Sequence, residues 1–156
     1  MTRPTRRASS TLFLLTLAVA VHSGCSRKES WQATTYPAWG TVTINGQPPK
    51  NAIITLHPKG EPVDIRHSKP YAMIDSNGRY KLQTYKLADG APAGDYAMTL
   101  HWLVDRTKPS PDRLGGIYHN PDNPLMELTI VKGKNQLPPI DLQGVKVLPG
   151  MPEKTQ

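Results

Sequence analysis

The feature that most constrains the fold of this chain is a succession of extended segments and turns between residues 71 and 104. Asp75–Gly78 is a turn signal, because Asn and Gly tolerate the positive φ that tight hairpin turns need. In Arg79–Thr84, polar and apolar residues alternate, which is typical of a strand with one wet face. After a second turn at Gly90–Gly94, one face of a long strand carries Tyr96, Met98, Leu100, Trp102 and Val104. This pattern predicts antiparallel β structure.

Similar alternation recurs before and after this region. Turns rich in Asn, Gly and Pro separate the segments, and no amphipathic helical pattern of useful length follows residue 25. Several short strands punctuated by turns favour a β-sandwich, and about 115 residues suffice for its core without a metal or a disulfide. We expect one domain over residues 38–148. Its seven strands are expected at 39–44, 52–57, 71–75, 79–84, 96–104, 126–130 and 140–142.

The first residues have the layout of a secretory signal. Arg3, Arg6 and Arg7 form a positive n-region, and Thr11–Val21 is an apolar stretch too short to read as a membrane-spanning helix. The following His22-Ser-Gly-Cys25 resembles a bacterial lipobox, in which cleavage before the cysteine precedes its lipid modification. His22 departs from that pattern, which usually has an aliphatic residue there. We expect residues 1–24 to be a helical lipoprotein signal peptide.

Cys25 is the only cysteine in the chain, so an exported protein of this sequence cannot form an internal disulfide. Acylation of Cys25, for instance with palmitate, explains its presence. The alternatives are an ordinary signal peptide with an incidental cysteine, and a cytosolic protein with an apolar N-terminal helix. Residues 25–37 are expected to form a flexible tether that holds the domain off a membrane, and 149–156 a disordered tail.

The charge of the chain argues against nucleic acid as a partner. The formal net charge of +7 falls to +4 once the three arginines before Cys25 are removed. The remaining lysines and arginines are scattered among acidic residues and form no basic stripe with interleaved aromatics. The expected partners are therefore the membrane, through the lipid, and a protein or glycan of the envelope.

Four motifs occur in order along the mature chain: Gly40-Thr-Val-Thr-Ile-Asn-Gly-Gln-Pro-Pro49, Asn51-Ala-Ile-Ile-Thr-Leu-His-Pro58, Asp75-Ser-Asn-Gly-Arg-Tyr-Lys-Leu82 and Gly90-Ala-Pro-Ala-Gly-Asp-Tyr96. Their order and spacing, over roughly residues 38–143, resemble those of transthyretin-like, carboxypeptidase-regulatory-like domains in small bacterial lipoproteins. The resemblance implies a seven-stranded antiparallel Greek-key β-sandwich and an outer-membrane or cell-surface location. Members mostly have no assigned function, so it implies no mechanism.

No metal, cofactor or catalytic motif stands out. Asp75-x-Asn77-Gly78 begins like a calcium loop, but Arg79 and Lys81 stand where further acidic ligands are needed. The histidines lack the spacing of zinc ligands, and no G-x-S-x-G elbow is present. The transthyretin-like hydroxyisourate hydrolases end in Tyr-Arg-Gly-Ser, whereas this chain ends in Met151–Gln156. We expect no enzymatic activity, no metal and no cofactor.

The first place to look for a ligand is residues 105–124, because structureless loops above about 12–15 residues are often functional. Exposed aromatic side chains that could stack on a sugar are the other candidates. We expect a non-enzymatic lipoprotein with a structural, adhesive or binding role. A carbohydrate-binding module is the alternative, and a hydrolase using His119, Asp112 or Asp122 comes third. The candidate ligand-binding residues are Trp31, Trp39, Asp112, Arg113, Tyr118 and His119.

Overall fold

A computed structural model describes residues 28–149 of the protein, and this part of the chain is all-β. No helix, and so none that could cross a bilayer, occurs in this range. The expected signal peptide at 1–24, Cys25 and nearly all of the expected tail at 149–156 lie outside the described residues. The strands are β1 (Thr35–Tyr36), β2 (Ala38–Ile44), β3 (Ile53–Pro58), β4 (Tyr71–Met73), β5 (Arg79–Lys81), β6 (Ala91–Pro92), β7 (Gly94–His101), β8 (Met126–Ile130), β9 (Asn135–Gln136) and β10 (Ile140–Leu142).

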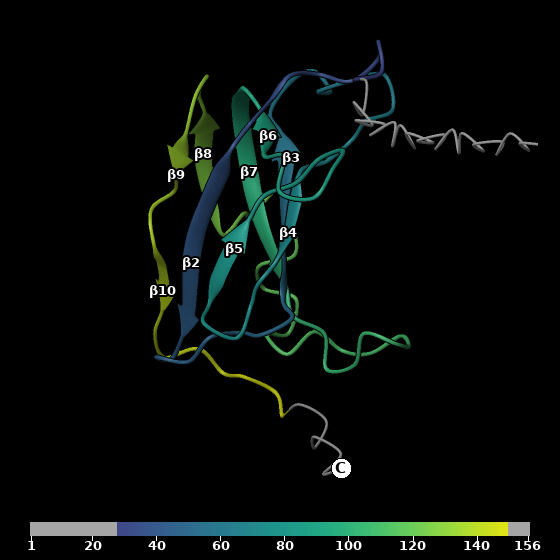
Figure 1. The fold of residues 1–156 in the computed structure, drawn as a ribbon. Helices are drawn as coiled ribbons and strands as arrows, with labels where there is room; N and C mark the ends of the chain where they lie inside the picture. Colours follow the sequence, from purple (N-terminus) through teal and green to yellow (C-terminus); the bar gives the residue numbers. More distant parts are fainter. Residues whose placement is uncertain (1–27, 150–156) are drawn as a thin grey trace, which may run out of the picture.

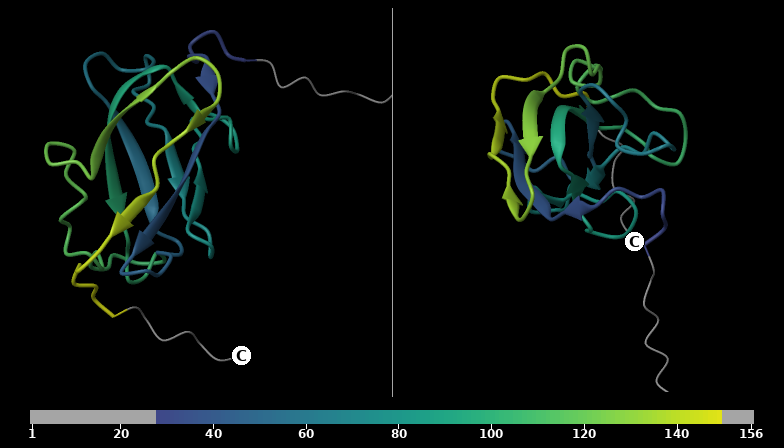
Figure 2. Two further views of the ribbon diagram at one scale, coloured as in Figure 1. Left: turned by 90° about the vertical axis from the view of Figure 1, so that its left-hand side faces the viewer. Right: turned by 90° about the horizontal axis from the view of Figure 1, so that it is seen from above.

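Two four-stranded sheets face each other across the core (Figure 1). The first sheet has the order β10-β2-β5, with β9 also paired to β2, and the second has the order β4-β3-β7-β8. A third, two-stranded sheet joins β1 to β6. Figure 2 shows the two larger sheets from the side and from above. This arrangement is consistent with the predicted sandwich.

Each of the expected strands overlaps an observed one, although β4 and β5 are shorter than expected and β7 begins and ends earlier. β1, β6 and β9 are two-residue strands that were not expected. Pairing is antiparallel throughout the second sheet. The first sheet departs from the expectation of a wholly antiparallel fold, because β9 and β10 both pair with β2 in parallel. After β8, the chain runs alongside β2 in the same direction as β2, so both β9 and β10 pair with it in parallel.

The segment predicted as a hairpin at 71–84 joins the two sheets instead. β4 pairs with β3 in the second sheet, and β5 pairs with β2 in the first. The turn is closed by the Asp75 amide, which donates to the Arg79 carbonyl at 2.9 Å, and the Asp75 carboxylate accepts from the Arg79 amide at 2.9 Å. Between this turn and the bridge at Tyr71 and Gln83, the two arms separate. The pattern located both strands but not their partners.

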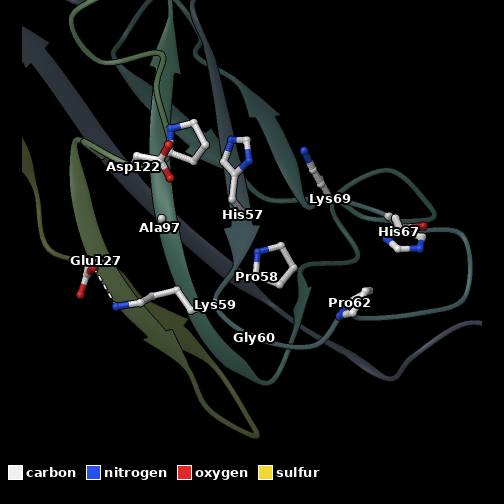
Figure 3. A pocket seen from close by; sticks show the side chains of 12 residues that line it. His57, Pro58, Lys59, Gly60, Pro62, His67, Lys69, Ala97, Asp122 and Glu127 are labelled. Atoms are coloured by element: carbon white, nitrogen blue, oxygen red, sulfur yellow. Dashed lines mark ion pairs between the residues drawn. The ribbon is translucent and has the colours of Figure 1, made fainter.

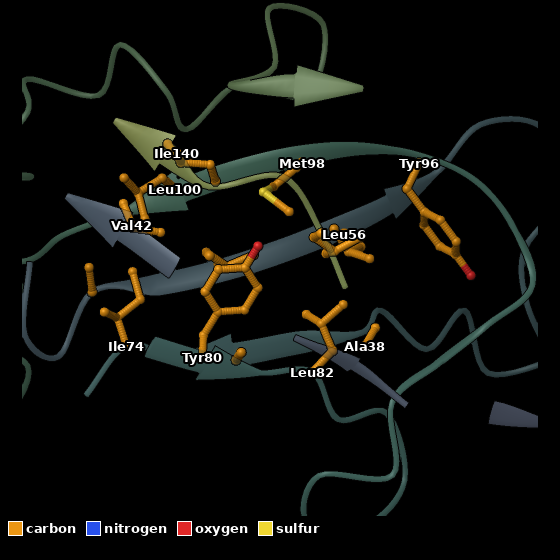
Figure 4. Packing of buried hydrophobic residues seen from close by; sticks show 14 of the residues in the cluster. Ala38, Val42, Leu56, Ile74, Tyr80, Leu82, Tyr96, Met98, Leu100 and Ile140 are labelled. Carbon is orange, nitrogen blue, oxygen red and sulfur yellow. The ribbon is translucent and has the colours of Figure 1, made fainter. Parts of the chain in front are cut away.

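The core lies between the two sheets and is built from the alternate residues that the sequence places inward (Figure 4). Fully burying one side chain the size of valine, leucine or methionine stabilises the fold by about 1.5–3 kcal/mol. Tyr80 lies over Gly40, where a Cβ would come within 2.5 Å of its hydroxyl oxygen. Contributors from both sheets include Val42, Ile54, Leu56, Leu82, Tyr96, Met98, Leu100 and Ile140.

The described part of the expected tether, residues 28–37, lies against the sandwich. Thr35 and Tyr36 pair with Pro92 and Ala91, and the Ala33 amide donates to the Tyr85 hydroxyl at 3.0 Å. Trp31 packs edge-on against Tyr85, with ring centroids 5.5 Å apart. The segment is held because its backbone finds partners on the sandwich and its indole finds an aromatic neighbour.

Candidate functional site

The connection between β7 and β8, which contains the loop predicted at 105–124, folds back onto the second sheet. The connection lies beside β7 just before β8 begins: the Leu100 amide donates to the Tyr118 carbonyl at 2.8 Å, and the Leu125 amide to the Met98 carbonyl at 2.8 Å. Thr99, which alternation placed on the wet face of its strand, is only 3 % exposed. The outer face of β7 is therefore covered rather than bare.

The connection has a packed interior of its own. Leu114 is fully buried, and the Arg113 amide donates to the Trp102 carbonyl at 2.7 Å. The Arg113 guanidinium lies over the Trp102 ring, 3.9 Å from its centroid, and its Nε donates to the Leu148 carbonyl at 2.9 Å. A cation over an indole face stabilises a structure by about 0.5–2 kcal/mol. Arg113 thus ties the connection to the strand end and to the C-terminal segment.

A row of histidines crosses the outer face of β3 and β7. The His57 Nε2 atom lies 3.0 Å from the Thr99 hydroxyl. The His101 and His119 rings are tilted by 42° with centroids 4.3 Å apart. Burial lowers the pKa of His57, with the charges of Lys69 and His119 acting in the same direction. Burial also lowers the pKa of His101, helped by His119 and opposed by Asp112. Both rings therefore favour the neutral state.

Asp112 stands at one end of this row. One carboxylate oxygen, Oδ1, accepts from the Leu114 amide at 2.7 Å. The other, Oδ2, is buried, has no hydrogen-bond partner among the described residues, and lies 3.7 Å from His101 Nε2. The side chain is only 8 % exposed. Asp112 is therefore placed to orient His101 and to stabilise its protonated form, against the effect of burial on the same ring.

A pocket of about 600 Å³ opens beside His57, between the loop that follows β3 and the end of the β7–β8 connection. Lys69 and Asp122 have no ion-pair partner among residues 28–149, whereas Lys59 pairs with Glu127 at 2.7 Å. In Figure 3, Asp122 and Lys69 stand on opposite sides of His57. Besides the Lys59–Glu127 ion pair, the pocket wall thus presents one negative and one positive side chain that lack an ion-pair partner, with an imidazole between them.

The described residues hold no group of three or more histidine, cysteine, aspartate or glutamate side chains placed to bind a metal ion. Thr99 supplies the hydroxyl that contacts a histidine, His57. This threonine is buried, and its hydroxyl donates to the Thr55 carbonyl at 3.4 Å. The histidine beside Asp112, by contrast, is His101. Within this part of the chain, the acid and the hydroxyl therefore meet different histidines.

The candidate ligand-binding residues are divided among four places. Asp112 and His119 both lie next to His101, the first through its carboxylate and the second through its ring. Tyr118, which precedes His119, packs against the core. Arg113 is engaged with Trp102. Trp31 lies in the N-terminal segment, where the Arg66 guanidinium covers its ring at 3.9 Å. Trp39 belongs to β2, opposite Lys81 and Gln136, in the other sheet.

The pocket was not found as a site from the sequence, although Asp122 was named for another role. Its other polar lining residues come from β3, from the loop at 59–70 and, in the case of Glu127, from β8. His57 was visible as an outward-facing residue of a strand. The approach of Lys69 and Asp122, 53 positions apart in sequence, depends on how two loops fold over one sheet, and no local pattern contains that information.

Comparisons of this chain with protein-family models, with curated proteins and with solved structures find no match.

Proposed function

We propose that this protein is an exported lipoprotein of the bacterial envelope, anchored by acylated Cys25, whose β-sandwich is a non-enzymatic binding module. The ligand it binds is a peptide segment of an envelope protein that carries both a carboxylate and an ammonium group. The observation that carries the binding role is the pocket at His57, with its two unpaired charges of opposite sign. The anchor rests on the sequence around Cys25.

We also propose that the domain is a seven-stranded Greek-key sandwich of the transthyretin-like type. Support comes from the order of motifs over residues 38–143 and from an all-β domain in which two four-stranded sheets enclose one core. In small envelope lipoproteins of this type, the signal peptide is removed and the mature chain begins at the lipid-modified cysteine.

The chemistry of the pocket wall sets the class of ligand. Lys69 would bind a carboxylate, and Asp122 would bind an ammonium group, each through a charge-assisted hydrogen bond. His57, kept neutral by burial, offers one ring nitrogen as an additional hydrogen-bonding group beside these charges. Ligands of a single charge would leave one of the two side chains unpaired, so the pocket favours a ligand with both.

The absence of catalysis in this proposal is supported by the separation of the groups that hydrolysis would need. A nucleophilic hydroxyl, a base and an orienting acid must form one connected series. Asp112 meets His101, whereas the Thr99 hydroxyl meets His57 and is buried. Asp122 lies in the pocket and not in either pair.

Glycan binding remains the second candidate, and one observation favours it. Trp39 is half-buried on the outer face of β2, and no aromatic partner or cation covers its ring among the described residues. Trp31 is less suited to stacking, because Arg66 already occupies one face of its indole. A polysaccharide pull-down that depends on Trp39 would favour this reading over the peptide pocket.

The binding role is tested by nuclear magnetic resonance titration of the mature protein with alanyl-alanine, acetate and methylamine. The dipeptide should shift the amide resonances of His57, Lys69 and Asp122 at lower concentration than either singly charged probe. Lys69→Met and Asp122→Asn should each weaken dipeptide binding by about tenfold or more, since a hydrogen bond to a charged group contributes about 1.5–3 kcal/mol. Lys134→Met, in the exposed turn before β9, is the matched control. Equal binding by all variants would refute the site.

A further inference from the structure

One end of the sandwich carries its two most exposed large hydrophobic side chains. Ile65 is 81 % exposed and Leu87 is 90 % exposed, whereas the other exposed large hydrophobics of the described residues lie between 43 % and 57 %. Ile65 lies in the loop between β3 and β4, and Leu87 in the loop between β5 and β6. Both loops reach the end at which the N-terminal segment meets the domain (Figure 1).

Contacts fix the two loops and the N-terminal segment to one another. The Tyr85 hydroxyl donates to Asp64 at 2.7 Å, which joins the loops next to their exposed tips. Trp31 lies between them, with Tyr85 at its edge and the Arg66 guanidinium over its ring. Ile65 and Leu87 are each one or two positions from these contacts, so both project from a braced surface.

The tips are held by their own hydrogen bonds as well. The Asp89 carboxylate accepts from the amides of Thr84, Tyr85 and Lys86, at 2.7 to 3.1 Å. Asp64 Oδ1 accepts from the Arg66 amide at 2.8 Å and the Ser68 amide at 3.2 Å. Each carboxylate therefore closes a compact turn that displays an aliphatic side chain to the outside. A partner that covered both side chains would gain the free energy of burying them, so this end of the domain suits an apolar partner.

The short separation between Cys25 and the first described residue points to a membrane as that partner. Lys28 is the first described residue of the N-terminal segment, and its Nζ donates to the Thr34 hydroxyl of the same segment at 2.9 Å. Cys25 is three residues earlier, and three extended residues span at most about 11 Å. A lipid on Cys25 would therefore keep Lys28 within about 11 Å of the bilayer surface.

We propose that Ile65 and Leu87 insert into the interface of the bilayer to which Cys25 is anchored. This inference rests on the proposed lipid anchor and adds an orientation to it: the end bearing Trp31 faces the lipid. Charges near the tips are of both signs, so attachment depends on the apolar tips rather than on anionic lipid. They belong to Lys28, Arg66 and Lys86 and to Glu29, Asp64 and Asp89.

The position of the pocket follows from this orientation. Pro62, His67 and Lys69 line it, and all three belong to the loop whose tip carries Ile65. The loop would thus contact lipid on one side and ligand on the other. A peptide segment would reach the pocket close to the membrane surface.

The experiment uses the acylated full-length protein in vesicles of phosphatidylethanolamine and phosphatidylglycerol. Once Cys25 is acylated, a single introduced cysteine is the only thiol available for an environment-sensitive fluorophore. Labels are placed by Ile65→Cys and by Leu87→Cys. The control is Ile117→Cys, at a residue that is 57 % exposed and next to Tyr118, at the far end of β7.

Labels at 65 and 87 should show blue-shifted emission and at least twofold stronger quenching by headgroup-level spin-labelled lipid than the label at 117. Retention on vesicles with equal quenching at all three positions would overturn the orientation and leave the anchor standing. Release of the protein from the vesicles, in a form indistinguishable from Cys25→Ser, would overturn the anchor and the orientation together. Stronger quenching at 117 would place the opposite end on the membrane and would also overturn the proposal.

Discussion

Gly90 is the residue at which the docking of the N-terminal segment can be tested by a single methyl group. A Cβ at this position would lie 1.8 Å from the Tyr36 carbonyl oxygen and 2.8 Å from the Pro37 nitrogen. Both contacts are with backbone, so no side-chain rotation relieves them. Its φ of +91° adds strain for any residue with a side chain. Gly90→Ala must therefore displace β1 from β6.

The expected cost has two parts. Backbone strain at positive φ costs about 1–2 kcal/mol, and loss of the short β1–β6 ladder costs about 1 kcal/mol for each hydrogen bond broken. The total of about 2–4 kcal/mol should lower Tm by about 10 °C, at roughly 4 °C for each kcal/mol in a domain of this size.

Gly46→Ala is the matched control. Its φ is +75°, but no atom lies within 4 Å of the position of the added Cβ. It should therefore show the strain alone, with a fall in Tm of about 4 °C for each kcal/mol. Thermal unfolding of both variants, followed by circular dichroism, makes the comparison. If Gly90→Ala is no less stable than Gly46→Ala, the reasoning that β1 is docked against β6 is refuted.

Three further predictions concern polar side chains that are buried or partly buried. The Tyr80 hydroxyl is buried without a partner among the described residues, and burial raises its pKa to about 12. Tyr80→Phe should therefore leave the free energy of unfolding, measured by chemical denaturation, unchanged or raise it by up to about 1 kcal/mol. A loss above about 1 kcal/mol would reveal a partner. Tyr85→Phe should cost about 1–3 kcal/mol and speed amide exchange at Ala33, whose donor loses its acceptor; unchanged exchange at Ala33 would contradict this. Since the pKa values of His57 and His101 are lowered by burial, the unfolded chain binds more protons below its histidine pKa of about 6.5, so stability should fall as pH drops from 6.5 through the lower folded values. The double variant His57→Gln, His101→Gln should flatten that part of the profile, and an unaltered slope would count against the assignment.

The sequence was sufficient to locate the strands because period-two alternation reports which side of each strand faces the core. Tyr96, Met98 and Leu100, which alternation put on one face of the long strand, are all buried. The sequence did not show which strands pair with one another. The sequence of Arg79–Lys81 predicts a hairpin partner for Tyr71–Met73, yet Arg79–Lys81 pairs with β2 and Tyr71–Met73 pairs with β3.

The candidate site was predicted only in part. The long connection rich in Gly and Pro pointed to Asp112 and His119 as candidates, and the structure places His101 beside both of them. The pocket at His57 and Lys69 was missed, because its walls come from two loops that meet only after the sheet has formed. Trp31 was read as part of a tether, and its contacts with Tyr85 and Arg66 depend equally on tertiary packing.

The central claim is that Cys25 carries the lipid that anchors the domain, and mass spectrometry of the protein extracted from membranes tests it most directly. The account expects the mature chain to begin at Cys25, with a mass that exceeds residues 25–156 by a thioether-linked diacylglycerol and an amide-linked fatty acyl chain. A mature chain that begins elsewhere, or an unmodified Cys25 in the membrane-bound protein, would contradict it.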